Sequence, residues 1–150
     1  MYKRQNVGYG TFEPLSNGII DSAIKLHEED YYISANSADL INNTIKNNGK
    51  ILSVGTTTLR ALESAFDEKS HKVICGHQST DIFISPGYKF KVVDGLVTNF
   101  HLPESSLLML VAAFAGKDNI MKAYNYAVQE KMRFFSYGDA MIIKQCLSKS

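Results

Sequence analysis

Apolar residues recur along the chain at two spacings, which predicts helices that alternate with strands. Ala38, Ile41 and Ile45 lie at the spacing that places side chains on one face of a helix. Ser34 or Ser37 can accept hydrogen bonds from the first amides of that helix, which have no partner within it. The pattern therefore predicts a capped helix with one buried face.

A short apolar run and a second helix follow. Residues 50–54 end at a glycine, as expected of a buried strand, and Leu59 and Leu62 then share a helical face. Thr56 or Thr57 can cap this helix. A strand followed directly by a helix is the repeating unit of α/β proteins, so we expect layered helices around a mostly parallel sheet.

The rest of the sequence continues this alternation. Residues 67–79 are polar and are expected to form a loop, and the glycines of residues 7–12 suggest a bent strand. No repeat, low-complexity tract or linker divides the sequence, so residues 1–150 are predicted to form a single α/β domain. Further strands are expected at 31–33, 81–84, 90–93, 96–100 and 140–143, and further helices at 107–115 and 120–128.

Composition restricts the class of protein more than its activity. Hydrophobic residues make up 45% of the chain, and the formal charge of +1 neither requires nor excludes a nucleic-acid partner. Two cysteines without a CxxC or HxxxH spacing give no support for a zinc site, so no metal is expected. The N-terminus lacks the apolar core of a signal peptide. The longest apolar run is shorter than the about 20 residues of a membrane span, so we expect a cytoplasmic protein with no membrane partner.

The turn between the second strand and the second helix is the first candidate site. Residues 55–58 place amides and hydroxyls at a helix N-terminus, where the helix dipole favours an anion. Arg60, one turn further on, can clamp an anion with its planar guanidinium. The alternative is that the threonines only cap the helix while Arg60 pairs with Glu63 or Glu68.

Residues 98–103 form the second candidate, at the expected carboxyl end of a strand. Ligands of open α/β sheets bind in the crevice at those ends. His101 titrates near neutral pH and can move a proton, and Asn99 can bind an amide or the edge of a base. The alternative is a histidine that bonds a backbone carbonyl and fixes the turn before Pro103.

Two carboxylates complete the candidates. Asp81 opens an otherwise apolar strand, so it is expected to bond either a neighbouring turn or a substrate. Tyr137 and Asp139 lie in an aromatic run at residues 133–140, which can form a stacking floor with an acid beside it. The alternative is that these aromatics belong to the core. The acidic pair that ends at Glu29 is expected on a solvated face.

Eight segments, read in order, carry a resemblance to one known family. They are residues 7–12, 54–64, 80–84, 86–94, 98–103, 108–111, 113–116 and 133–141. These segments resemble the S-adenosylmethionine:tRNA ribosyltransferase-isomerase family of queuosine biosynthesis. The resemblance covers nearly the whole chain from residue 6 on. So many long segments in the same order argue against a chance similarity.

The resemblance implies a reaction that the residues alone do not. Family members transfer and isomerise the ribosyl part of S-adenosylmethionine, which therefore serves as the ribosyl donor. The acceptor is the aminomethyl group of a 7-deazaguanine at the wobble position of tRNA. Adenine and methionine leave, and the product base is epoxyqueuosine. The expected partner is thus a tRNA that carries 7-aminomethyl-7-deazaguanine.

This reaction suggests roles for the candidate residues. A base must take a proton that the sulfonium makes acidic, and an anion site must hold the methionine carboxylate or a tRNA phosphate. The expected catalytic residues are Asp81, His101 and Asp139. The expected substrate-binding residues are Gly55, Thr56, Thr57, Thr58, Arg60, Asn99 and Tyr137.

The sequence also departs from the family pattern. Family members carry a long N-terminal portion with an inserted β-barrel, which has no counterpart in these 150 residues. We therefore expect the chain to resemble the C-terminal part of a longer two-domain enzyme and to be poorly active alone, with the missing portion supplied elsewhere. The alternatives are a non-catalytic α/β module that binds a nucleotide or RNA, and an inactive truncated product.

Overall fold

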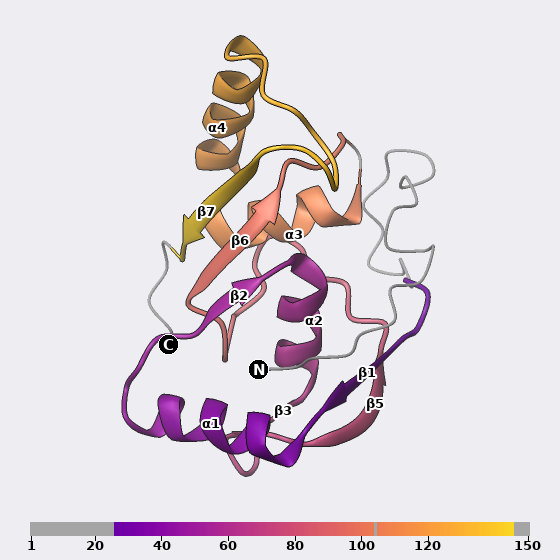
Figure 1. Ribbon diagram of the computed structural model, residues 1–150, viewed down its shortest axis with the longest axis vertical. Coiled ribbons are helices and arrows are strands. Elements are labelled where there is room, and N and C mark those ends of the chain that lie inside the picture. The colour runs from indigo at the N-terminus through magenta and orange to yellow at the C-terminus, as the bar shows by residue number, and fades with distance from the viewer. Residues whose placement is uncertain (1–25, 104, 146–150) are drawn as a thin grey trace.

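The computed structural model describes residues 26–103 and 105–145, which contain both strands and helices (Figure 1). The bent strand expected at residues 7–12 lies outside the described residues. The elements are β1 (Glu29–Ile33), α1 (Ala35–Lys46), β2 (Leu52–Val54), α2 (Thr56–Ser64), β3 (Phe66–Asp67), β4 (Lys72–Val73), β5 (Gly76–Thr80), β6 (Gly95–Asn99), α3 (Ser106–Ala115), α4 (Lys117–Gln129) and β7 (Ala140–Lys144).

A three-stranded sheet in the order β2-β6-β7 forms the centre of the described chain (Figure 1). In this sheet Ser53 lies opposite Leu96, and Leu96 lies opposite Ile143. All three side chains are buried on the face where α2 packs against β2 and β6, and α3 packs against β7. The opposite face presents Leu52 and Ile142, which are exposed among the described residues.

The α/β class is confirmed, but the sheet is mixed rather than mostly parallel, which corrects the expected strand directions. β2 and β6 run parallel, whereas β6–β7, β1–β5 and β3–β4 are antiparallel pairs. The chain returns from α4 to the carboxyl end of β6, where Ala140 pairs with Asn99. Because β7 enters the sheet at that edge, it runs back against β6.

Two segments that were expected to be strands are irregular, because side chains bind their backbone groups. In residues 81–84, the Arg60 Nε donates a hydrogen bond to the Ile82 carbonyl at 3.2 Å. In residues 90–93, three successive amides donate to the Glu63 carboxylate at 2.8, 3.0 and 2.9 Å. These bonds satisfy the backbone without a neighbouring strand.

The segment at residues 67–79 is not the predicted loop, since it contains β4 and most of β5. β5 carries polar side chains and pairs antiparallel with β1 from Gly76 to Thr80. β4 is joined to α1 through Asn42, whose side chain bonds both the amide and the carbonyl of Val73 at 2.8 and 3.0 Å. Neither pairing has a local apolar pattern, which explains why the sequence did not indicate these strands.

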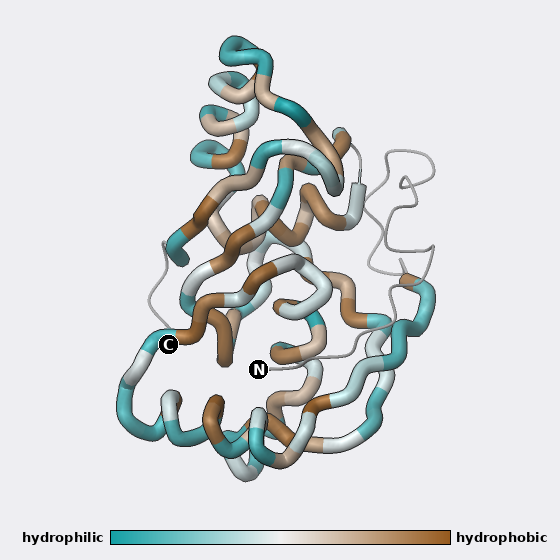
Figure 2. The backbone as a smooth tube through the Cα atoms, viewed as in Figure 1, coloured by the Kyte–Doolittle hydropathy of each residue, from teal (hydrophilic) through white to brown (hydrophobic). Residues whose placement is uncertain are grey.

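The other elements predicted within the described residues are confirmed. Ser34 caps α1 by accepting a hydrogen bond from the Ser37 amide at 3.1 Å. The helix α3 is largely hydrophobic, as the colouring of Figure 2 shows. Its Leu110 and Phe114 side chains are almost completely buried. No helix among the described residues has the length and apolar character that crossing a membrane would require.

Candidate functional site

The turn that follows β2 leads directly into α2. Gly55 has a φ of 90°, in the left-handed region that glycine adopts readily, and its amide donates to the Val97 carbonyl at 2.8 Å. This bond ties the turn to the neighbouring strand β6. The helix begins at Thr56 without a side-chain cap, so Thr56 and Thr57 do not cap it as expected. The start of α2 therefore keeps the positive end of its dipole at the edge of the sheet.

A pocket of about 150 Å³ lies at this edge, where β2 and β6 both end. Because these two strands are parallel, their carboxyl ends meet at the same edge, as the sequence analysis assumed. The pocket brings together five of the ten expected site residues. Its lining consists of Gly55, Thr56, Thr57, Thr98, Asn99, His101, Leu102, Ser105, Leu107, Phe135 and Ser136.

His101 is held in this pocket by two hydrogen bonds. Its Nε2 lies 3.0 Å from the Thr98 Oγ1, and its backbone amide donates to the Tyr124 hydroxyl at 2.9 Å. Burial of the imidazole lowers the pKa of His101 to about 4, so the ring is neutral at pH 7. A neutral imidazole offers one donor and one acceptor, and its protonated form would be an unusually strong acid.

Asn99 connects the pocket to residues 130–139, the loop between α4 and β7. Its amide nitrogen donates to the carbonyls of Gly138 and Asp139 at 3.3 and 3.2 Å. In the same loop, the Phe135 amide donates to the Phe100 carbonyl at 3.0 Å. These bonds fix the loop against the carboxyl end of β6.

Arg60 does not line the pocket. Its side chain is only 3% exposed, and its Nη1 lies 3.0 Å from the Glu29 Oε2. The expected partners Glu63 and Glu68 are bound elsewhere, to backbone amides and to Lys91 respectively. Glu29 is buried on β1, so the expectation of a solvated face is wrong for this residue. Burial raises the pKa of Glu29, and the charge of Arg60 opposes that rise.

Four more of the expected residues lie outside the pocket. Asp81 is exposed directly after β5, and Tyr137 is 97% exposed. Thr58 is half-buried on α2 and is not part of the lining. Asp139 accepts hydrogen bonds from the Arg133 amide and guanidinium at 2.8 and 3.2 Å, and these bonds lower its pKa. A carboxylate with a lowered pKa is a weaker proton acceptor.

Several lining residues were not predicted from the sequence. Ser105 caps α3, accepting from the Leu108 amide at 3.2 Å, and helix caps give no separate signal for a pocket. Phe135 follows another phenylalanine, and the pattern does not tell which of the two rings turns toward the core. Among the described residues, no group of three or more His, Cys, Asp or Glu side chains is placed to hold a metal ion.

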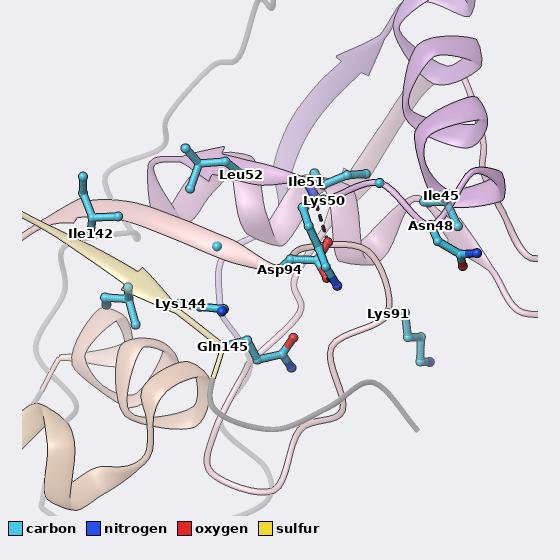
Figure 3. A pocket seen from close by; sticks show the side chains of 13 residues that line it. Ile45, Asn48, Lys50, Ile51, Leu52, Lys91, Asp94, Ile142, Lys144 and Gln145 are labelled. Carbon is cyan, nitrogen blue, oxygen red and sulfur yellow. Dashed lines mark hydrogen bonds and ion pairs between the residues drawn. The ribbon is translucent and has the colours of Figure 1, made fainter.

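A second and larger hollow, of about 770 Å³, lies at the opposite end of the sheet, where β2 and β6 begin (Figure 3). Here the Asp94 carboxylate accepts hydrogen bonds from the Ile51 amide at 2.9 Å and from the Lys50 Nζ at 3.2 Å. Leu52 and Ile142 form an apolar part of the wall of this hollow. None of the ten expected site residues lines this hollow.

Comparison with known proteins shows relatives that are longer than this chain. A protein from Treponema denticola is 55% identical over 142 residues, which cover 95% of this chain and 41% of the relative. A protein from Thermoanaerobacter sp. is 55% identical over 139 residues, which cover 92% of this chain and 40% of the relative. Both are named S-adenosylmethionine:tRNA ribosyltransferase-isomerase. The chain thus spans about two fifths of the length of the curated relatives it matches.

A solved structure and a family model lead to the same family as these relatives. A crystal structure of an S-adenosylmethionine tRNA ribosyltransferase from Thermotoga maritima matches with a TM-score of 0.69 and 49% identity, over 78% of this chain and 41% of that chain. A family model described as "Queuosine biosynthesis protein" matches residues 4–143, nearly the entire chain. The predicted resemblance is therefore confirmed, and the chain belongs to the queuosine biosynthesis protein family.

Proposed function

We propose that this chain supplies part of the active site of an S-adenosylmethionine:tRNA ribosyltransferase-isomerase. The reaction would move the ribosyl group of S-adenosylmethionine onto 7-aminomethyl-7-deazaguanine in tRNA and give epoxyqueuosine. The observation that carries the proposal is that residues 55–57, Asn99 and His101 share one pocket at the carboxyl ends of two parallel strands. The names of the relatives and the family support the same reaction. A cytoplasmic location is part of the proposal.

The pocket offers groups that this reaction needs. The uncapped start of α2, with the Thr56 and Thr57 hydroxyls, suits the carboxylate of the methionine or the hydroxyls of the ribose. The His101 imidazole is neutral at pH 7 and can take the proton that the sulfonium makes acidic. With a pKa of about 4, the resulting imidazolium readily returns that proton, for example to the departing adenine.

We assign the proton transfer to His101 ahead of the other two expected catalytic residues. Asp81 and Asp139 lie outside the pocket lining, whereas His101 is part of it. Of the expected binding residues, Arg60 acts at a distance in this proposal. It holds α2 against β1 through Glu29, and thereby positions the turn at the start of the helix.

We further propose that the rest of the substrate site comes from polypeptide beyond these 150 residues. A pocket of about 150 Å³ is small beside the about 300–1,000 Å³ of common ligand sites. It can hold one part of S-adenosylmethionine, but not the whole donor together with a tRNA base. The curated relatives are more than twice as long as the matched region. The chain alone should therefore turn over slowly.

Adenine release from S-adenosylmethionine tests this function. The assay would use tRNA that carries 7-aminomethyl-7-deazaguanine, first with the chain alone and then after addition of the remaining portion of the Treponema denticola relative. We expect little adenine from the chain alone and a large increase in the mixture. His101→Ala should reduce the rate in the mixture by about 10²-fold or more, the usual contribution of a general acid–base group.

The matched control is His77→Ala, because His77 lies on β5 against Tyr32 and outside the pocket. It should leave the rate unchanged. Full activity of the His101→Ala mixture would remove His101 from the mechanism. Adenosine binding without adenine release in any mixture would favour the non-catalytic nucleotide-binding module instead.

A further inference from the structure

The wall of the pocket is divided between polar and apolar groups. The start of α2 and the end of β6 provide hydroxyls, an amide and an imidazole. Leu102, Leu107 and Phe135 provide the apolar part. Phe135 is 51% exposed, so a large aromatic ring stands at a polar pocket without being covered by the described residues. Exposed aromatic rings at a pocket are common where a flat ligand binds.

The neighbouring Phe134 shows that an aromatic ring in this loop can be packed against the rest of the molecule. Phe134 packs into an aromatic cluster, with its ring centroid 5.3 Å from that of Phe100 and 5.9 Å from that of Tyr124. Phe135 has a φ of 68°, a backbone conformation that residues with a side chain rarely adopt. Such a conformation persists when the surroundings enforce it, and it occurs often at ligand sites.

The surroundings do enforce it. The Gly138 amide donates to the Phe135 carbonyl at 2.9 Å, and the Asp139 amide donates to the Arg133 carbonyl at 2.8 Å. Asn99 binds the carbonyls of Gly138 and Asp139 from the neighbouring strand. A Cβ atom at Gly138 would lie 2.4 Å from the Arg133 carbonyl oxygen, so the loop closes with no space to spare. The backbone that carries Phe135 is thus held in place beside the pocket, and Phe135 is part of the lining.

We propose that Phe135 is the residue that stacks on the flat face of a purine-type ring bound in this pocket. The identity of the ring rests on the proposed function, which offers the adenine of the donor and the 7-deazaguanine of the acceptor. Stacking on an aromatic side chain accepts either ring, because both have an extended π-face. Tyr137 is the aromatic residue of this loop that the sequence favoured for stacking. It is unsuited to that role, because it is almost fully exposed and does not line the pocket.

The chain contains no tryptophan, so a single introduced tryptophan reports on one position. In the full 150-residue chain, Phe135→Trp keeps an aromatic ring at the pocket, and Tyr137→Trp places the same ring elsewhere in the same loop. Adenosine and 7-deazaguanosine are titrated separately, with methionine and ribose as non-aromatic probes. We expect at least one of the two nucleosides to quench the fluorescence of Phe135→Trp to a plateau. The same nucleoside should quench the fluorescence of Tyr137→Trp weakly and without reaching a plateau. The nucleoside that saturates at the lower concentration identifies the ring.

Equal quenching of the two variants, or no saturable quenching of Phe135→Trp by either nucleoside, would overturn the proposal. A second measurement separates stacking from simple apolar contact. Equilibrium dialysis of the nucleoside should show binding to Phe135→Leu about tenfold weaker than to the unchanged chain, whereas Phe135→Tyr should bind as the unchanged chain does. Unchanged binding to Phe135→Leu would show that the ring is not needed.

The outcomes also separate this inference from the proposed function. Saturable quenching without adenine release in the reconstituted mixture would leave the stacking residue in place and reject the ribosyl transfer. Adenine release together with unchanged nucleoside binding to Phe135→Leu would reject the stacking residue and leave the reaction in place.

Discussion

At the carboxyl ends of β2 and β6 the chain gathers hydroxyls, an amide and a neutral imidazole around a pocket of about 150 Å³, whereas the amino ends of the same strands border a hollow of about 770 Å³. In the larger hollow, Asp94 already binds the Ile51 amide and Lys50. In the smaller pocket, α2 starts without a side-chain cap. We therefore place the proposed binding site at the smaller pocket, because the start of a helix favours an anion, rather than at the larger hollow.

The difference follows from strand direction. A strand that leads into a helix delivers the positive end of the helix dipole to the carboxyl end of the sheet. β2 does so through Gly55, and β6 leads through His101 toward α3 at the same edge. At the opposite edge, β2 and β6 enter the sheet from loops, and the Asp94 carboxylate fixes the entry of β2 by binding the Ile51 amide. We therefore expect ligand binding to depend on the carboxyl end and only stability to depend on the amino end.

One glycine at each end gives the largest expected difference. In Gly138→Ala at the carboxyl end, the new Cβ would lie 2.4 and 2.6 Å from the carbonyl oxygens of Arg133 and Phe134, which are backbone atoms. We expect the free energy of unfolding to fall by about 2–3 kcal/mol. In Gly95→Ala at the amino end, the closest atom is the Leu52 Cδ1 at 2.8 Å, the tip of an exposed side chain that can rotate away. The cost should be below about 0.5 kcal/mol.

Urea denaturation followed by circular dichroism measures both values. Combined with Phe135→Trp, the Gly138 substitution should also abolish saturable quenching by the nucleoside, while the Gly95 substitution should preserve it. Equal losses of stability and of binding in the two variants would contradict the assignment of ligand binding to one end of the sheet.

His101 gives the next largest effect, through pH. Burial lowers its pKa from 6.5 to about 4 in the folded chain, so the unfolded chain binds the proton more readily between these values. The free energy of unfolding should therefore fall as the pH drops from about 6.5 toward 4, by about 2.5 kcal/mol from this residue, and its contribution should level off below about pH 3.

Urea denaturation of the unchanged chain and of His101→Gln at pH 7 and pH 4 checks this prediction. Other groups contribute equally to both chains, so the difference between them isolates His101. A pH dependence that is the same in both chains would mean that the imidazole is more accessible to water than the pocket geometry implies.

Elements with a periodic apolar face could be predicted from the sequence, and so could part of the site. α1, α3, α4, β2 and β6 were all expected, because local spacing alone defines which of their faces is buried. The co-location of Gly55 and His101 was also predictable, since each follows an apolar strand and parallel strands end at one edge.

Pairings between distant residues could not be predicted. Arg60 binds Glu29, 31 residues away, instead of a glutamate on its own helix, and this removes it from the pocket. Glu63 binds backbone amides 28 to 30 residues away and thereby replaces an expected strand. Phe134 and Phe135 are adjacent residues of the same type, so the sequence does not distinguish them. Phe134 packs into the aromatic cluster, and Phe135 is therefore the ring that stays at the surface.

Asp94 tests the amino end directly. In Asp94→Ala, the Ile51 amide loses its carboxylate acceptor, and the entry of β2 loses the bond that fixes it. We expect the free energy of unfolding to fall by about 1–2 kcal/mol, the usual cost of leaving a partly buried donor without its acceptor. Nucleoside quenching of Phe135→Trp should be unchanged in this background, which fluorescence titration measures. Weaker binding would show that the two ends of the sheet are coupled.

Lys50 sharpens the same point with the smallest expected effect. Its side chain is 80% exposed, and its ion pair with Asp94 spans 3.2 Å at the surface. Solvent and salt screen such a pair, and ordering a long side chain costs entropy, so Lys50→Ala should change the free energy of unfolding by less than about 0.5 kcal/mol. If Asp94→Ala is costly and Lys50→Ala is not, the carboxylate stabilises the amino end through the backbone of β2 rather than through charge. Urea denaturation could instead show that both substitutions are equally costly and that the cost of each falls in high salt. The charge interaction between Lys50 and Asp94 would then stabilise the amino end, in addition to the hydrogen bond to the Ile51 amide.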